Sequence, residues 1–332
     1  MRKKSFTLLF QFCFLIAMGT IMVACNNNSV DNMPREEALK ELDAKIDKDK
    51  NNADLHYQRG MLLITLGKEK SLSQYFKDAI VDLKKAIEID NTKSEYYTAL
   101  GDAHFSLGNV GDSYTALQEA LRIDPENFEA CLKMGEIAFY SKDYDRAMEN
   151  LSKVTAQDKN NQTALFMKGF IYKETGDTTN AVGYFRRIIE LYPDYEPAYE
   201  ELGMLYAQHR NKLGLEYLTT ALSLKPDNIN VLYGLAILYQ DAEDAEKANE
   251  YYVKILEIDP QNKYAWFNRG WMEMVLYEDY NAAVDFFSKA IDSDPNYAEA
   301  YHNRGLAYEL MGDKTNASAN YDQANKLGYK EN

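Results

Sequence analysis

The sequence has little proline, little cysteine and no excess of basic residues. Its 332 residues include only 7 prolines and are 46% hydrophobic, which excludes a collagen-like or disordered chain. The 3 cysteines, Cys13, Cys25 and Cys131, are too few and too far apart to form a disulfide framework. Lys and Arg number 37 against 52 Asp and Glu, giving a net charge of −15. Because such an acidic surface repels phosphate, nucleic acid is disfavoured as a partner.

Signatures of catalysis and metal binding are also missing. The sequence contains none of the motifs GxGxxG, GxxxxGK[ST], GxSxG or HExxH, so it has no recognisable phosphate loop, nucleophile elbow or zinc helix. The four histidines, His56, His104, His209 and His302, cannot share one helical face at metal-ligand spacing. Cys131 is expected to be a buried core thiol, as unpaired cysteines usually are. The sequence therefore predicts no catalytic residue, no metal site and no cofactor.

The first residues have the pattern of an export signal. Arg2, Lys3 and Lys4 precede a mainly apolar run that ends in the small residue Ala24, just before Cys25. A basic start, an apolar middle and a small final residue are typical of a secretory signal. The alternative is an uncleaved signal anchor, because the apolar run is just long enough to span a bilayer. In both cases the basic start stays inside and the rest of the chain lies outside the cytoplasm.

The end of this run, Met22-Val23-Ala24-Cys25, resembles the lipobox of bacterial lipoproteins. The resemblance implies a signal peptide over residues 1–24, a lipid anchor on Cys25 and a short tether over residues 25–33. Asn26 stands where an aspartate retains some members of that family at the inner membrane. We therefore expect a protein of the bacterial cell envelope, lipid-anchored at the outer membrane and facing the periplasm or the surface.

The remainder of the sequence repeats itself at intervals of mostly 34 residues. A glycine recurs at the same point of each repeat, and a small residue follows about twelve positions later, or nineteen positions later in the first repeat. The glycines are Gly60, Gly101, Gly135, Gly169, Gly203, Gly270 and Gly305, with Ala236 in the one gap, and the small residues are Ala79, Ser113, Ala147, Ala181, Gly214, Ala248, Ala283 and Ala317. Apolar residues follow a helical period, and breakers such as "LGN" and "MGD" separate the helices of a pair. Each repeat is therefore predicted to be a helix–turn–helix.

These positions resemble the signature of the tetratricopeptide repeat (TPR), which has the same period. The segments "YYTALGDAHFSLGN" and "AYHNRGLAYELMGD" are the clearest copies. The resemblance implies an all-α fold, a right-handed α-solenoid of about eight helix–turn–helix repeats behind a capping half-repeat helix over residues 34–52. The solenoid is expected over residues 53–330 as one continuous stack, because no repeat can bury its apolar face alone. The expected repeats cover 53–93, 94–127, 128–161, 162–195, 196–228, 229–262, 263–297 and 298–330.

The first repeat carries seven extra residues, with the excess around residues 69–76. Loops tolerate insertions at little energetic cost, so a longer second helix or a surface loop is the simpler interpretation. The alternative is a lip over a binding groove, because the segment includes Leu72, Tyr75 and Phe76.

The resemblance also implies a binding surface, because the first helices of TPR repeats line a concave groove. Carried over position by position, it predicts a partner-binding groove that contains Tyr57, Phe105, Phe139, Tyr140, Phe166, Phe170, Tyr233, Phe267, Trp271, Glu95, Asp102 and Glu136. Trp271, beside Phe267, is the strongest single candidate. The alternative is that about half of these aromatic side chains pack against neighbouring helices. Other acids of the first helices, such as the adjacent Glu200 and Glu201, are expected to be solvated charges.

Aromatic anchors among acidic residues favour proteins or peptides with basic segments as partners, near or in the membrane. The sequence thus predicts a non-catalytic, membrane-tethered TPR scaffold that binds proteins through an acidic, aromatic-lined groove. It resembles the TPR lipoproteins that scaffold cell-wall hydrolases or help to assemble pili and secretion pores. One alternative is a permanent structural or assembly subunit of an envelope complex for pilus formation, secretion or uptake. Another is an enzyme or glycan-binding module on a helical scaffold, which would need a convergent polar cluster. A small-molecule substrate is not expected.

Overall fold

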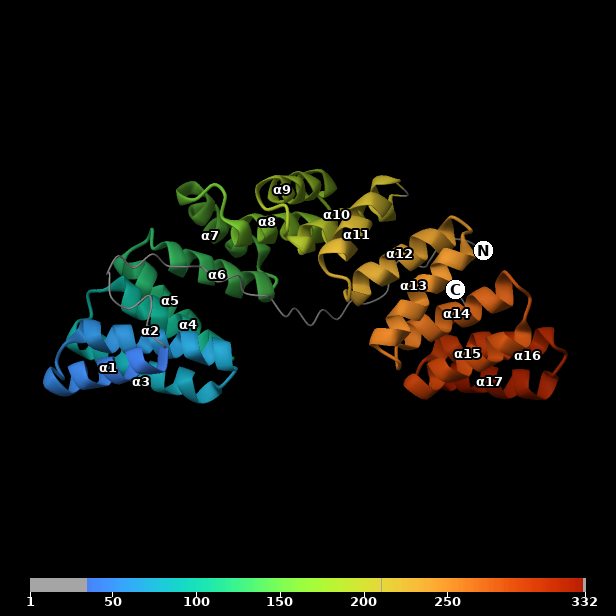
Figure 1. Cartoon of the computed structure of the whole chain (residues 1–332), viewed down its shortest axis with the longest axis horizontal. Helices are drawn as coiled ribbons and strands as arrows, with labels where there is room; N and C mark the ends of the chain where they lie inside the picture. Colours follow the sequence, from blue (N-terminus) through green and yellow to red (C-terminus); the bar gives the residue numbers. More distant parts are fainter. Residues whose placement is uncertain (1–34, 210, 331–332) are drawn as a thin grey trace. The chain divides into compact units, whose positions relative to one another are not determined.

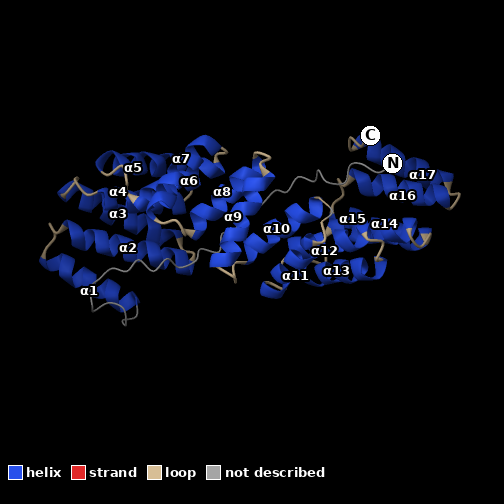
Figure 2. Ribbon diagram, turned by 90° about the horizontal axis from the view of Figure 1, so that it is seen from above, coloured by secondary structure: helices blue, strands red, loops and turns tan. Residues whose placement is uncertain are grey.

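The computed structural model describes residues 35–209 and 211–330, and the signal, Cys25 and the tether lie outside these residues. The described part contains seventeen α-helices and no strand, which confirms the all-α fold class (Figure 2). A lone helix, α1 (Arg35–Lys48), is followed by eight pairs of antiparallel helices. The first helices of the pairs are α2 (Ala53–Lys70), α4 (Ser94–Ser106), α6 (Phe128–Tyr140), α8 (Gln162–Glu174), α10 (Glu196–Gln208), α12 (Ile229–Asp241), α14 (Lys263–Val275) and α16 (Ala298–Leu310). The second helices are α3 (Ser73–Ile89), α5 (Val110–Ile123), α7 (Tyr144–Gln157), α9 (Thr178–Leu191), α11 (Leu213–Leu224), α13 (Ala245–Ile258), α15 (Tyr280–Ser293) and α17 (Lys314–Lys326).

The helices form two compact units, and the division falls within α9, between Ala181 and Val182. Unit 1 comprises α1 to the start of α9, and unit 2 comprises the rest of α9 to α17 (Figure 1). Both units consist of paired helices, as predicted for the repeats, and the continuity of the stack from one unit to the other stays a prediction.

Side-chain caps mark where many of the helices begin. The Asn127 side chain accepts a hydrogen bond from the Ala130 amide at the start of α6, and Asn161 and Asn262 cap α8 and α14 in the same way. Asp143 and Asp244 do so for the second helices α7 and α13. Each cap satisfies an amide that the helix itself leaves unbonded, which stabilises the helix by about 1 kcal/mol.

The recurring glycines allow the two helices of a pair to approach closely. A Cβ atom at Gly101 would lie 2.6 Å from Cγ of Leu117, which is fully buried between α4 and α5. Next to it, the Ser113 hydroxyl donates a hydrogen bond to the Gly101 carbonyl at 2.7 Å. The period of small residues therefore encodes backbone contact between the paired helices.

The extra residues of the first repeat lengthen its helices. Helix α2 has 18 residues and α3 has 17, whereas the first helices α4 and α6 have 13 and the second helices α5 and α7 have 14. Phe76 is buried and packs on Gly67, where a Cβ atom would lie 2.7 Å from its ring. Leu72 remains exposed in the short turn between the two helices. The structure therefore agrees better with the simpler interpretation than with a lip over a groove. The insertion lengthens both helices of the pair, and Phe76 belongs to the core between them.

Candidate functional site

Five of the predicted aromatic residues form a continuous series across the first helices of unit 1. Phe105 of α4 stacks on Tyr140 of α6, with ring centroids 6.3 Å apart. Tyr140 meets Phe139 edge to face at 5.5 Å, and Phe139 meets Phe170 of α8 in the same manner at 5.4 Å. Phe170 in turn lies 6.4 Å from Phe166. We call Phe105, Tyr140, Phe139, Phe170 and Phe166 the aromatic ladder.

The members of the aromatic ladder differ in how accessible they are. Tyr140 is 43% exposed, Phe105, Phe139 and Phe170 are half-buried, and Phe166 is buried. Burial, aided by the nearby Glu136 carboxylate, raises the pKa of Tyr140 to about 12, so its hydroxyl is neutral and able to donate a hydrogen bond. Phe166 therefore serves the core of unit 1, and Tyr140 is the ladder residue best placed to contact a partner.

The predicted acids Asp102 and Glu136 are paired with lysines beside the aromatic ladder. The Lys68 ammonium donates to an Asp102 oxygen at 2.6 Å, and Lys133 lies 3.5 Å from the other Asp102 oxygen. Lys133 also donates to Glu136 at 2.8 Å, and its ammonium sits 5.7 Å from the centroid of the Phe105 ring. This ion-pair network joins α2, α4 and α6 and balances two negative charges with two positive ones.

In this network the ion pairs outweigh the effect of burial on the pKa values of Asp102 and Lys133. Burial alone would raise the pKa of the Asp102 carboxyl, but Lys133 and Lys68 together hold it below its ordinary value. Burial alone would lower the pKa of Lys133, but Glu136 and Asp102 raise it above its ordinary value. One Asp102 oxygen, Oδ1, is buried without a hydrogen bond. Both acids are therefore paired with lysines, rather than free to attract a basic partner.

Sequence reasoning missed Lys68, because the equivalent position of the next repeat, Asn109, lies in the turn between α4 and α5. In this chain it is helical, since the insertion extends α2 to Lys70. The seven extra residues were the signal that could have found it.

Tyr57 and Glu95 occupy other places in unit 1. Tyr57 lies 5.0 Å from Tyr96, whose hydroxyl donates a hydrogen bond to Asp54. Glu95 is exposed in the first turn of α4. Neither side chain belongs to the aromatic ladder.

The three predicted residues of unit 2 are partly built into its core. Tyr233 accepts a hydrogen bond from the Asn268 amide at 3.0 Å. Phe267 lies 5.5 Å from Phe287 and 5.2 Å from Tyr297, measured between ring centroids. Trp271 is half-buried and packs against the core clusters on both sides of α14. Trp271 thus packs partly between helices and keeps part of its surface exposed, and its place in a binding groove stays a prediction.

A second polar arrangement in unit 2 contradicts the expectation that Glu200 is a solvated charge. The Asn228 amide nitrogen donates to Glu196 at 2.7 Å and to Glu200 at 2.8 Å, which ties α10 to the start of α12. Burial raises the pKa of Glu200 to about 7, and the neighbouring Glu201 and Glu196 charges add to the shift. Glu201 is itself only 5% exposed. The start of α12 removes water from these acids and so raises the pKa of Glu200, and the sequence alone does not reveal this contact.

Two further findings concern the described residues alone. Residues 35–209 and 211–330 contain no group of three or more His, Cys, Asp or Glu side chains placed to hold a metal ion. In the same residues, no helix is both long and apolar enough to cross a bilayer.

Cys131 is fully buried, and burial raises its pKa, as expected for an inert core thiol.

Family profiles of the repeat match most of the described chain. A profile described as "Cytochrome c-type biogenesis protein H TPR domain" matches residues 67–199. Profiles described as "Tetratricopeptide repeat" match residues 205–267 and 298–327, and one described as "TPR repeat" matches residues 278–312.

Individual relatives are distant. DnaJ homolog subfamily C member 7 of Mus musculus is 22% identical over 66% of this chain and 58% of its own length. The structure of pilF from Pseudomonas aeruginosa has a TM-score of 0.54 at 21% identity, over 68% of this chain and 99% of its own. A tetratricopeptide repeat protein from Parabacteroides merdae has a TM-score of 0.55 at 18% identity, over 72% of this chain and 94% of its own. This chain spans less than two thirds of the curated mouse relative, and the two structures bear on the fold alone. The repeat signature, the paired helices and the family profiles together identify the chain as a tetratricopeptide repeat protein.

Proposed function

We propose that this chain is a non-catalytic scaffold, tethered to a membrane of the bacterial envelope, that binds segments of other proteins on the aromatic ladder of unit 1. The TPR fold is a protein-interaction fold and is typically non-catalytic.

The aromatic ladder is the observation that carries the proposal. It brings rings from α4, α6 and α8 into one contact series, although their residues are up to 65 positions apart in the sequence, from Phe105 to Phe170. Rigid aromatic side chains provide contact area at a low cost in conformational entropy, and they dominate the binding energy of many protein interfaces. Tyr140 is the most exposed ring of the series and adds a neutral hydroxyl.

The ion-pair network supplies the polar part of the same surface. Lys133 and Asp102 are held in place by Lys68 and Glu136, so a bound segment meets fixed charges of both signs next to the rings. The exposed Glu95 and the net charge of −15 leave segments with Lys or Arg as the favoured partners, because the overall field attracts them.

The proposed location depends on residues 1–33, which precede α1. A lipid on Cys25 would hold the scaffold near its membrane, since the roughly nine residues from Cys25 to Met33 span at most ~30 Å when extended. Partners in or near the membrane would therefore be within reach.

The test is crosslinking in intact cells followed by mass spectrometry, comparing wild type with a Phe139→Ala, Tyr140→Ala variant. Circular dichroism establishes that the variant is folded. A matched control is Leu72→Ala, which removes an exposed apolar side chain from the turn between α2 and α3. We expect the double variant to lose a discrete partner that the control retains. An unchanged partner set would refute binding on the ladder and favour the permanent assembly subunit.

A further inference from the structure

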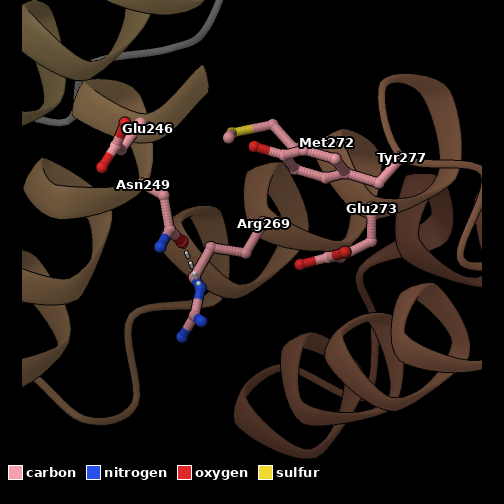
Figure 3. Close-up of a pocket in the computed structure, with 6 residues that line it drawn as sticks. All are labelled: Glu246, Asn249, Arg269, Met272, Glu273 and Tyr277. Atoms are coloured by element: carbon pink, nitrogen blue, oxygen red, sulfur yellow. Dashed lines mark hydrogen bonds between the residues drawn. The ribbon is translucent and has the colours of Figure 1, made fainter. Parts of the chain in front are cut away.

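A cavity in unit 2 lies between α13 and α14, apart from every residue assigned above to the aromatic ladder. It has a volume of about 430 Å³ and is open to solvent. Helix α13 contributes two lining residues, α14 contributes three, and the turn after α14 contributes one (Figure 3). They are Glu246, Asn249, Arg269, Met272, Glu273 and Tyr277.

The positive charge of this cavity is already engaged. Arg269 donates through Nε to the Asn249 side-chain oxygen at 2.9 Å. Its guanidinium carbon lies 4.3 Å from the centroid of the Phe286 ring and 5.6 Å from that of Trp266. Figure 3 shows the guanidinium directed away from Met272 and Tyr277. The arginine therefore forms part of the wall, held by an amide and two aromatic faces.

The two carboxylates that line the cavity, Glu246 and Glu273, form no close ion pair in the part of the chain that the structure describes. Among the described residues, no Lys, Arg or His nitrogen lies within ion-pair distance of Glu246 or Glu273. Glu273 is half-buried, and burial together with the Asp279 charge raises its pKa above the ordinary value, although the Arg269 charge opposes part of this rise. A partly desolvated carboxylate that forms no close ion pair is stabilised by a cation that enters from outside.

An apolar rim adjoins the cavity at the end of α14. Val275, Leu276 and Tyr277 are 46%, 40% and 55% exposed, and Tyr277 also lines the cavity. At the end of the neighbouring first helix, α16, Leu310 and Met311 are 50% and 42% exposed. The two helix ends are close, because Met274 and Ala307 share one core cluster just before them. A run of exposed apolar side chains beside a polar cavity is typical of an interaction surface.

We propose that this edge of unit 2 is a second docking surface, for a partner polypeptide segment whose lysine or arginine side chain enters the cavity while adjacent apolar side chains cover the rim. Charge complementarity selects the basic side chain, since two carboxylates, Glu246 and Glu273, line the cavity against the single cation Arg269, which is held in its wall. Met272 and the Tyr277 ring offer apolar walls for the stem of such a side chain. The rim residues supply the contact area that a single buried charge pair lacks.

The probe for this surface is a fluorescein-labelled peptide, acetyl-Leu-Lys-Leu-amide, titrated with the full-length protein in fluorescence anisotropy. A peptide with Gln in place of Lys is its matched partner. We expect Glu273→Gln to weaken binding of the lysine peptide about tenfold and to leave the glutamine peptide unchanged, because only the charge pair is lost. The control Glu257→Gln removes an equal charge from the exposed far end of α13 and should leave both affinities as in wild type.

Three outcomes would overturn the proposal. The lysine and glutamine peptides could bind equally, Glu273→Gln could bind like wild type, or the rim could pair with a second copy of the chain. The third is tested by sedimentation, in which a concentration-dependent dimer abolished by Tyr277→Ser would mark a self-interface. The Phe139→Ala, Tyr140→Ala variant should bind the lysine peptide like wild type. The test of this second docking surface is therefore independent of the test of the aromatic ladder.

Discussion

Phe139 of α6 and Phe170 of α8 meet edge to face, with ring centroids 5.4 Å apart, and so link two successive repeats of unit 1. The same Phe139 touches Tyr140 and Tyr144, which makes it the central ring of the aromatic ladder. One side chain thus contributes both to the stacking of the repeats and to the proposed binding surface.

Gly101→Ala should destabilise unit 1 by roughly 1–3 kcal/mol, because the added methyl group would overlap Leu117 and force the two helices apart. Chemical denaturation followed by circular dichroism measures the loss. Gly111→Ala is the matched control, since nothing lies within 4 Å of a Cβ atom at this helical position of α5. This control should be neutral or gain about 0.5–1 kcal/mol from helix propensity. Equal effects at both positions would contradict the close-approach explanation.

Asp102→Asn should cost roughly 1–3 kcal/mol at neutral pH, because it removes the carboxylate shared by Lys68 and Lys133. The pKa of Asp102 is lower in the folded protein than in the unfolded chain, so its stabilisation is present above the unfolded pKa of about 4. That contribution is lost as the pH falls through the lower folded value. Denaturation of wild type and variant should therefore differ at pH 7 and converge in acid. A constant difference down to about pH 2 would show that the ion pairs are not its source.

Glu200→Gln should stabilise the protein at pH 8 and flatten its pH dependence. Burial raises the folded pKa of Glu200 to about 7, whereas the unfolded value is about 4.3. Between these two pH values the folded state therefore binds a proton that the unfolded chain has released. Stability should consequently rise as the pH of wild type falls from 7 toward 4.3, by roughly 2–3 kcal/mol. Glutamine keeps an oxygen that accepts from Asn228, so the variant should lack this rise.

The measurement for Glu200 is the melting temperature against pH, with the exposed Glu299→Gln as a control for the loss of one charge. A rise that survives in Glu200→Gln would assign the proton to another group, such as Glu196, whose pKa burial also raises.

Cys25→Ser should release the protein from the membrane fraction if the lipid on Cys25 is the anchor. Cell fractionation and labelling with a radioactive fatty acid measure this directly. Cys13→Ser is the matched control, because Cys13 lies within the apolar run of the signal and should leave labelling unchanged. Continued labelling of Cys25→Ser would rule out lipidation there, and an unlabelled protein that stays membrane-bound would favour the uncleaved signal anchor.

The helix pairs follow from local sequence patterns, and for that reason they could be predicted. The spacing of Gly101 to Ser113 within a repeat reports a contact between adjacent helices, and Asn127 or Asp143 marks a helix start within a few residues. The aromatic residues from Phe105 to Phe170 could likewise be named from their repeat positions.

The environment of each site residue depends on contacts that no local pattern contains. Lys68 reaches Asp102 only because α2 is longer than a standard first helix. Glu200 is desolvated beside Asn228, which lies 28 residues further along the chain. Trp271 has the position of a groove residue, yet it is flanked by core clusters whose side-chain sizes determine its burial. Charge compensation and desolvation depend on tertiary contacts. For this reason the sequence could name the groove residues but could not predict which of them are exposed or which of their charges are paired.

The central claim is that the aromatic ladder binds another protein, and a photocrosslinking amino acid in place of Tyr140 tests it most directly. Irradiation of intact cells should yield a discrete crosslinked partner from position 140. The same photocrosslinker in place of the exposed Leu72 should yield none of that product. An identical set of products from both positions, or none from position 140, would contradict the account.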